Sequence, residues 1–326
     1  MSLDYMRFNS DGMLNNYKME RDAIRKYDKE TPITTNLMGT YKGLDYFKWA
    51  KRNGYRILGQ LPELQYTMEP RSYDPRPDAR PQRRTVHADG ADSEPAELAA
   101  VQLLKETGPD ARTELSDRCT RRRHDSVFQL RRSVGGCEKF HGAVIAHAGT
   151  ADTRVFCEVT QLGKELEKIG SRVMGSENHA KVGIIFDWEN YWALEYTSGP
   201  NRDLRYVDQI EQMYNYFYNK NIAVDMIPID ADFSKYDLVA APVLYMVKDG
   251  VAESLEAYVQ AGGTLITTYM SGIVGQSDNV HLGGYPGPLR KWAGSVVEEM
   301  TLLHRSRETR SVSQTEPRKS AVSYAT

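Results

Sequence analysis

Cysteine is scarce in this sequence, and its scarcity argues against two kinds of stabilising chemistry. The 326 residues contain only Cys119, Cys137 and Cys157, an odd and scattered set. Such a set suits a reducing compartment better than a disulfide framework. No two of them have the C-x-x-C spacing, so a cysteine-built zinc site is not expected. The sequence predicts no metal site and no cofactor.

Long apolar runs and a strong net charge are also missing. No run approaches the roughly 18 residues that a transmembrane helix needs, and Met1 to Phe8 lacks the basic and then apolar pattern of a signal peptide. The net charge is −2, which gives no general argument for a nucleic-acid or membrane partner. We therefore expect a cytoplasmic protein that binds neither nucleic acid nor a membrane. The length allows two ordinary domains, each with its own core.

Aliphatic residues are almost missing from residues 71–84, the start of an internal stretch, 71–126, that differs sharply from the rest of the chain. Residues 71–84 are rich in proline and arginine, residues 118–124 form a second basic cluster, and only 96–105 could be helical between them. A compact domain rarely contains such a long structureless segment, so this one asks for an explanation. Taken at face value, the runs Arg76–Arg84 and Arg118–His124 leave nucleic-acid binding open as an alternative.

Strands and helices alternate clearly from 180 to 270. The continuous apolar run Val182–Phe186 predicts a strand buried on both faces, and further strands are expected at 222–227, 238–245 (interrupted by Pro242) and 264–268. Apolar residues at helical spacing predict two helices between them, one through Leu204, Val207, Ile210, Tyr214 and Phe217 with Asp203 as its cap, and one through Val251, Leu255 and Val259. This alternation predicts a doubly wound parallel sheet with covering helices.

Gly262-Gly263 follows the second of these helices and is interpreted as its stop, because the spacing of a nucleotide-binding loop is missing. Helices are also expected at 17–27 and 44–50, and a short β-like run at 32–36. A further helix passes through Val155, Val159, Leu162, Leu166 and Ile169, with Asp152 or Thr153 as its cap and Gly170 as its stop. The tail from Thr301 is polar and expected to be disordered.

Seven short phrases in the chain form an ordered set. They are Asp4–Phe8, Thr31–Asn36, Leu44–Ala50, Cys137–Gly142, Phe186–Asn190, Ala241–Met246 and Gly283–Pro288. In content and order they resemble glycoside hydrolase family 42, the β-galactosidases, and the resemblance covers roughly residues 3–52 and 128–300. Together the phrases are far more specific than any one of them.

The resemblance implies an α/β protein with a partial (β/α)8 barrel followed by a doubly wound, flavodoxin/glutamine-amidotransferase-like trimerisation domain. It places the partial barrel in residues 1–170, the trimerisation domain in 180–300 and a disordered tail in 301–326. It also implies a homotrimer that hydrolyses terminal non-reducing β-D-galactose residues with retention, through two glutamates. No cysteine stands in 180–300, so amidotransferase activity is not expected from that domain.

The departures from the family pattern concern both glutamates. The barrel half that carries the acid/base glutamate and the family's cysteine-bound metal site is not found in these residues. The nucleophile phrase Met-Leu-Met-Glu-Gln-Thr-Pro-Ser is expected where His87–Pro95 stands, and one choice of codons for His87–Pro95 encodes that phrase in another frame. We therefore interpret about 53–61, 72–127 and the tail as out-of-frame translations. No catalytic residue is assigned, and the chain is expected to be inactive. A non-catalytic oligomerisation module is the alternative.

Two pairs of polar residues remain as candidate sites. In the family's Glu-x-x-His phrase, matched by Glu138 and His141, both residues contact the galactosyl unit; the alternative is a solvated or structural pair. Asp187 and Glu189 follow a predicted strand end and could form an acid pair, but their position in the α/β domain favours a structural role. Trp188, Tyr191 and Trp192 are expected to lie in the core or at a subunit contact.

Overall fold

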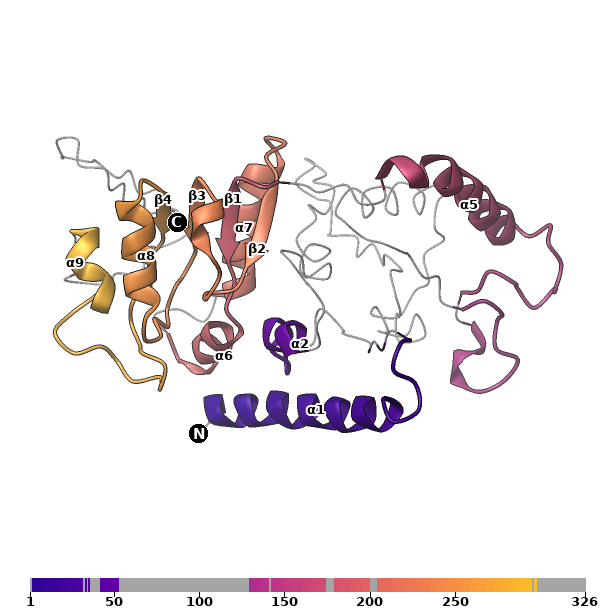
Figure 1. Cartoon of the computed structure of the whole chain (residues 1–326), viewed down its shortest axis with the longest axis horizontal. Coiled ribbons are helices and arrows are strands. Elements are labelled where there is room, and N and C mark those ends of the chain that lie inside the picture. Colours follow the sequence, from indigo (N-terminus) through magenta and orange to yellow (C-terminus); the bar gives the residue numbers. More distant parts are fainter. Residues whose placement is uncertain are drawn as a thin grey trace. The chain divides into compact units, whose positions relative to one another are not determined.

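The computed structural model describes residues 2–31, 33, 35, 42–52, 129–140, 142–173, 179–199, 204–294 and 296–297 (Figure 1). The chain divides into two compact units. The first combines residues 1–33, 40–69 and 179–326, and the second combines 34–39 and 70–178. Segments far apart in the sequence therefore build the first unit.

A four-stranded parallel sheet forms the centre of the first unit. Its strands are β1 (Val182–Ile185), β2 (Val224–Ile227), β3 (Leu238–Ala241) and β4 (Thr264–Thr267), in the order β2-β1-β3-β4. Figure 1 shows them side by side in that order. Val182 is level with Val224 of β2 and Leu238 of β3. The predicted doubly wound parallel sheet is confirmed.

Helices cover both faces of this sheet. Side chains alternate between the faces of a strand, and on one face Ile185, Ile227 and Val239 join a buried cluster with Leu255 of α8 (Val251–Gln260) and Phe233 of η2 (Phe233–Lys235). The alternate residues of β1 and β2 face the other side, where α7 (Tyr206–Tyr218) packs against both strands. The amphipathic spacing seen in the sequence is the cause of this arrangement.

The boundaries of these elements differ slightly from the prediction. β2 begins at Val224 rather than 222, and β3 ends at Ala241, because Pro242 has no N–H to donate to a strand ladder. α7 begins at Tyr206 behind Arg205, whose side chain makes no capping bond, while the expected cap Asp203 lies outside the described residues. α8 ends at Gln260, and Gly262 has a φ of +99°, so the predicted glycine stop is confirmed.

Among the described residues of the first unit, three helices lie N-terminal to α7. α1 (Ser2–Ile24) begins fifteen residues before the helix expected at 17–27 and ends before residues 25–27, which form a turn. α2 (Tyr46–Arg52) corresponds to the helix expected at 44–50. α6 (Trp188–Tyr196) directly follows β1 and was not predicted. In Figure 1, α1 passes α6, which it contacts.

The second unit is described by fewer elements. α5 (Arg154–Val173) confirms the predicted helix, but it continues through Gly170 to Val173. Neither expected cap acts: the buried hydroxyl of Thr153 has no hydrogen-bond partner among the described residues, and the carboxylate of Asp152 accepts a hydrogen bond from Thr150. η1 (Cys137–Phe140) lies between Arg131 and Ile145, which form a parallel bridge.

Several predicted features lie wholly or partly outside the described residues. They are the β-like run at 32–36, the possible helix at 96–105, the basic runs, the segments interpreted as out of frame at 53–61 and 72–127, and the tail from 301. Among the helices that the structure does describe, none is both long and apolar enough to cross a membrane.

Candidate functional site

A cluster of polar side chains lies at the carboxyl edge of the sheet between β1 and β3. β1 is followed along the chain by β2 on one side of it, whereas β3 is followed by β4 on the other side. A crevice at such a switch point is the usual ligand position in open α/β sheets. Here the edge is occupied by the chain itself, through the loop 242–250 and the start of α6.

Asn190 fixes the turn that follows β3. Its side-chain amide donates to the carbonyl of Val243 at 3.1 Å and accepts from the backbone N–H of Met246 at 2.7 Å. Val243 has a φ of +47°, which is strained for a β-branched residue, and its N–H donates to the hydroxyl of Thr268 at 2.8 Å. A strained residue after a strand can carry a catalytic nucleophile. Val243 is fully buried and its side chain has no reactive atom, so the strained position of this turn carries none.

Asp187 and Glu189 lie at the start of α6, as the strand-end prediction expected. Asp187 caps this helix by accepting from the N–H of Asn190, and it accepts from Lys248 Nζ at 2.8 Å. The same ammonium lies 3.2 Å from Glu189 Oε2, which also accepts from Arg7 Nη2 at 2.7 Å. The four residues form a chain of alternating charges that runs from the sheet edge to α1.

Burial and these partners shift the pKa values of Lys248, Glu189 and Asp187. Burial alone would favour a neutral amine, but the carboxylates of Asp187 and Glu189 outweigh it and raise the pKa of Lys248. For Glu189 burial acts to raise the pKa, and the hydrogen bond from Arg7 and the charge of Lys248 lower it overall. Burial raises the pKa of Asp187, against the opposing effect of Lys248.

This geometry supports the structural interpretation of Asp187 and Glu189. A retaining glycosidase needs one carboxylate free to attack and another that can donate a proton. Both carboxylates here are engaged by cations, and Asp187 is only 6% exposed. The neighbouring Trp188 and Trp192 are buried core residues, as the sequence indicated.

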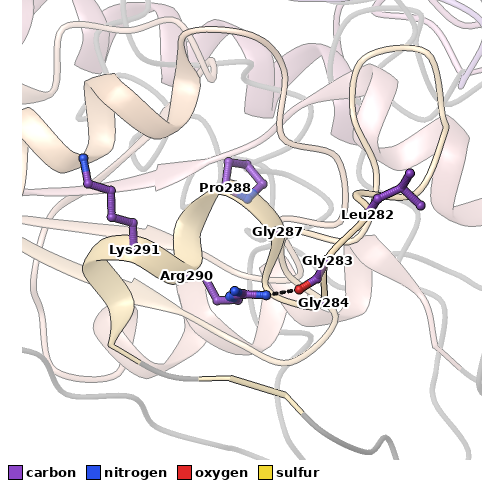
Figure 2. A pocket seen from close by; sticks show the side chains of 7 residues that line it. All are labelled: Leu282, Gly283, Gly284, Gly287, Pro288, Arg290 and Lys291. Atoms are coloured by element: carbon purple, nitrogen blue, oxygen red, sulfur yellow. Dashed lines mark hydrogen bonds between the residues drawn. The ribbon is translucent and has the colours of Figure 1, made fainter.

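A second candidate site is an open pocket of about 430 Å³ formed by the loop before α9 (Arg290–Ala293) and the start of that helix. It is lined by Leu282, Gly283, Gly284, Gly287, Pro288, Arg290 and Lys291. Figure 2 shows the Arg290 guanidinium directed at the carbonyl of Gly283, to which it donates a hydrogen bond. Because a loop carbonyl already engages Arg290, the pocket holds Lys291 as its remaining cation.

The structure describes the predicted sugar contacts only in part. Glu138 lies in η1, but its side chain and the whole of His141 are outside the described residues. Their role as galactosyl contacts therefore stays a prediction. In the part of the chain that the structure describes, no group of three or more His, Cys, Asp or Glu side chains could hold a metal ion.

Comparison with known proteins places both units in one family. A family model described as beta-galactosidase matches residues 1–169, and one described as beta-galactosidase trimerisation domain matches residues 180–323, which extends past the expected tail boundary at 301. The curated beta-galactosidase BgaP of Planococcus sp. (strain L4) is 45% identical over 93% of this chain and 45% of its own length. Beta-galactosidase LacZ of Lactobacillus acidophilus is 45% identical over 92% of this chain and 45% of its own length.

Solved structures show the same relationship. The beta-galactosidase of Bacillus circulans sp. alkalophilus superposes with a TM-score of 0.71 at 37% identity, over 94% of this chain and 46% of that one. The enzyme of Rahnella sp. R3 gives a TM-score of 0.73 at 34% identity, over 90% and 44%. The predicted fold class, a partial barrel followed by an α/β trimerisation domain, is thereby confirmed. The chain spans less than half the length of these relatives.

Proposed function

The chain belongs to glycoside hydrolase family 42, the β-galactosidases, and we propose that it supplies part of the barrel and the assembly domain of an enzyme that removes terminal non-reducing β-D-galactose. The observation that carries the proposal is the 45% identity to a named β-galactosidase over 93% of this chain. The proposed reaction proceeds with retention through two glutamates, which places two carboxyl groups about 5–5.5 Å apart across the scissile bond.

Glu138 and His141 are proposed to bind the galactosyl unit. The phrase Cys137–Gly142 in which they stand is one of the seven that carry the family resemblance. A carboxylate accepts hydrogen bonds from sugar hydroxyls and an imidazole can donate or accept them, so the residue types suit the role. Equilibrium binding of galactose to the purified chain, with Glu138→Gln and His141→Asn, tests it. Both variants should weaken binding at least tenfold, whereas the neighbouring Cys137→Ser should not.

The 326 residues by themselves are proposed not to hydrolyse galactosides. The phrase expected to hold the nucleophile is replaced by His87–Pro95, and no residue of the sequence matches the phrase of the acid/base glutamate. General acid catalysis and nucleophilic attack each contribute orders of magnitude to the rate, so the loss of both should abolish turnover. Resequencing the DNA across 53–127 tests the out-of-frame interpretation directly, since an uninterrupted frame with no missing or extra base would refute it.

The assay is hydrolysis of a chromogenic β-galactoside by the purified chain, with an intact relative such as the Planococcus enzyme as the positive control. We expect no turnover above a buffer blank. Turnover that survives purification and is inhibited by galactose would show that other residues supply the acid and the nucleophile.

A non-catalytic oligomerisation module is the second candidate, and the self-contained core of the α/β unit favours it. A buried cluster joins three of its strands with α8, η2 and the turn at 244–247. The matched trimerisation model suggests that this module assembles as a homotrimer. Light scattering on the eluting chain should give three times the mass of 37.0 kDa. A monomer at micromolar concentration would count against assembly through this module alone.

A further inference from the structure

Helix α6 contacts α7, the turn after β3 and the segment formed by the described residues 2–31 and 42–52. Toward that segment, Glu189 accepts from Arg7, and Glu195 accepts from Lys42 Nζ at 2.8 and 3.0 Å. The indole N–H of Trp192 donates to the carbonyl of Lys42. Glu189, Trp192 and Glu195 lie at the first turn, the middle and the last turn of α6. The contacts with the segment are therefore spread along the whole length of this helix.

Aromatic packing buries the middle of the same joint. The rings of Tyr46 and Trp188 meet edge to face with centroids 5.0 Å apart, and both residues are at least 98% buried. Three residues further along α2, the ring of Trp49 packs against that of Tyr17 of α1 with centroids 5.8 Å apart. The indole N–H groups of Trp49 and Trp188 are buried and have no hydrogen-bond partner among the described residues. Charges beside these buried rings are therefore screened less than charges at the surface.

Asp45 brings an additional carboxyl group to this joint. It directly precedes Tyr46 and caps α2, accepting from the N–H of Lys48 at 3.0 Å, and its own N–H donates to the hydroxyl of Ser10 at 2.9 Å. Tyr46 contacts Trp188, which lies between Asp187 and Glu189 in the sequence. Burial is the main cause that raises the pKa of Asp45, the charges of Asp187 and Glu189 add to it, and the charge of Lys248 opposes them. Among the described residues, no cation lies within ion-pair distance of Asp45.

The charges around Asp45 do not balance. α6 and its cap contribute Asp187 and Glu189, the β3–α8 loop contributes Lys248, and α1 contributes Arg7 and Asp11, of which Asp11 pairs with Lys48 of α2. Asp187 and Glu189 pair with Lys248 and Arg7, and Arg7 also lies 3.5 Å from the exposed carboxylate of Asp4 on α1. The carboxylates therefore already outnumber the cations, and an ionised Asp45 adds one more negative charge.

We propose that Asp45 is a pH-sensitive latch that couples the attachment of residues 42–52 to the protonation state of the joint on α6. With the proton bound, the segment packs tightly against Trp188 and the chain of charges. When the proton is lost, repulsion from Asp187 and Glu189 acts on α2 at its cap and loosens the segment. The proposal does not depend on whether the chain hydrolyses galactosides.

Tryptophan fluorescence of the full chain reports on this joint, because Trp49, Trp188 and Trp192 are three of its four tryptophans. As the pH rises from 4.5 to 7.5, the emission should shift to longer wavelength and acrylamide should quench it more strongly. The midpoint should lie near pH 6, because burial raises the pKa of Asp45 to about 6. Asp45→Asn keeps an oxygen that can cap α2 but cannot ionise, and it should lose the transition and keep the emission of the acid form.

Asp208→Asn, at an exposed position on α7, is the matched control and should retain the transition. Circular dichroism of each variant establishes that its helices are formed. The proposal is overturned if the native chain shows no transition, or if Asp45→Asn shows the same transition as the native chain. The second outcome would assign the titration to another group, either a histidine or Asp187, whose pKa is also raised by burial.

Discussion

At the scale of single residues, the stability of the fold depends on keeping both partners of the buried ion pair between Asp187 and Lys248. Removing one partner of a buried ion pair leaves an uncompensated charge, which typically costs about 3–5 kcal/mol. Lys248→Met keeps the length of the side chain and leaves Asp187 unpaired at 7% side-chain exposure. We expect the free energy of unfolding to fall by about 3 kcal/mol at pH 7, measured by urea denaturation.

The matched control is Lys181→Met, because Lys181 pairs with Asp237 at 3.6 Å with both side chains largely exposed. An exposed pair of this kind contributes at most about 1 kcal/mol. Equal losses for the two variants would mean that burial does not strengthen the Lys248 pair.

Asp45 makes a further residue-scale prediction with a definite sign. Its pKa is about 6 in the folded chain because of burial, and about 3.9 in an unfolded chain. The folded state therefore holds the proton more tightly, so the contribution of Asp45 to stability is greatest below about pH 4 and declines as the pH rises to about 6. The difference corresponds to about 3 kcal/mol. The unfolding free energy of Asp45→Asn, relative to the native chain, should rise by that order between pH 4 and pH 7.

A constant difference between Asp45→Asn and the native chain across that range would contradict this linkage.

The sequence alone could not predict the ion pairs of Asp187 and Glu189. Asp187 and Lys248 are 61 residues apart, and Arg7 is 182 residues from Glu189. The strand-end pattern did predict where Asp187 and Glu189 would lie, but not the cations that engage them.

At the scale of secondary-structure elements, the exit of α8 depends on Gly263. A Cβ at this position would lie 2.2 Å from the ring of Tyr258, whose hydroxyl donates to the carbonyl of Tyr236. The ring would have to move, and its hydrogen bond would be lost. Overpacking of this kind costs typically about 1–3 kcal/mol, so Gly263→Ala should lower the midpoint of thermal unfolding.

Gly12 offers the control, because it lies inside α1 and a Cβ there would meet nothing within 4 Å. Alanine is favoured over glycine in a helix by about 0.5–1 kcal/mol, so Gly12→Ala should raise the stability of the chain. A loss of stability from Gly12→Ala would mean that α1 has a neighbour at this position in the assembled protein.

The elements differed in how far the sequence could predict them. The sheet was predictable because its strands are continuous apolar runs separated by helices of clear 3.6 periodicity. α6 was not, because six of its nine residues are buried, which removes the polar face that reveals an amphipathic helix. The start of α1 was obscured for the opposite reason, since Tyr5 and Phe8 are exposed and blur the apolar stripe.

At the scale of the whole molecule, residues 2–31 and 42–52 belong to the same compact unit as the α/β sheet. The family pattern divides the chain at about 170–180, into a barrel part and a trimerisation part. That division stays a prediction. The contacts of α6 with α1, Lys42 and Tyr46 cross it, and they bury Trp188 and Trp192 almost completely.

Two arrangements are possible: α6 holds the N-terminal residues against the α/β sheet, or the two parts separate at about 170–180. Limited proteolysis followed by native size-exclusion chromatography and mass spectrometry distinguishes them. If α6 joins both parts, a fragment containing residues 2–52 should elute with a fragment containing 179–297 even after the chain is cut between them. Glu189→Gln combined with Trp192→Phe removes the Arg7 ion pair and the hydrogen bond to Lys42 while leaving the helix intact. That variant should release the N-terminal fragment at a protease dose that leaves the native pair together. Release of residues 2–52 from the native chain at the first cut would show that the α/β sheet folds without them.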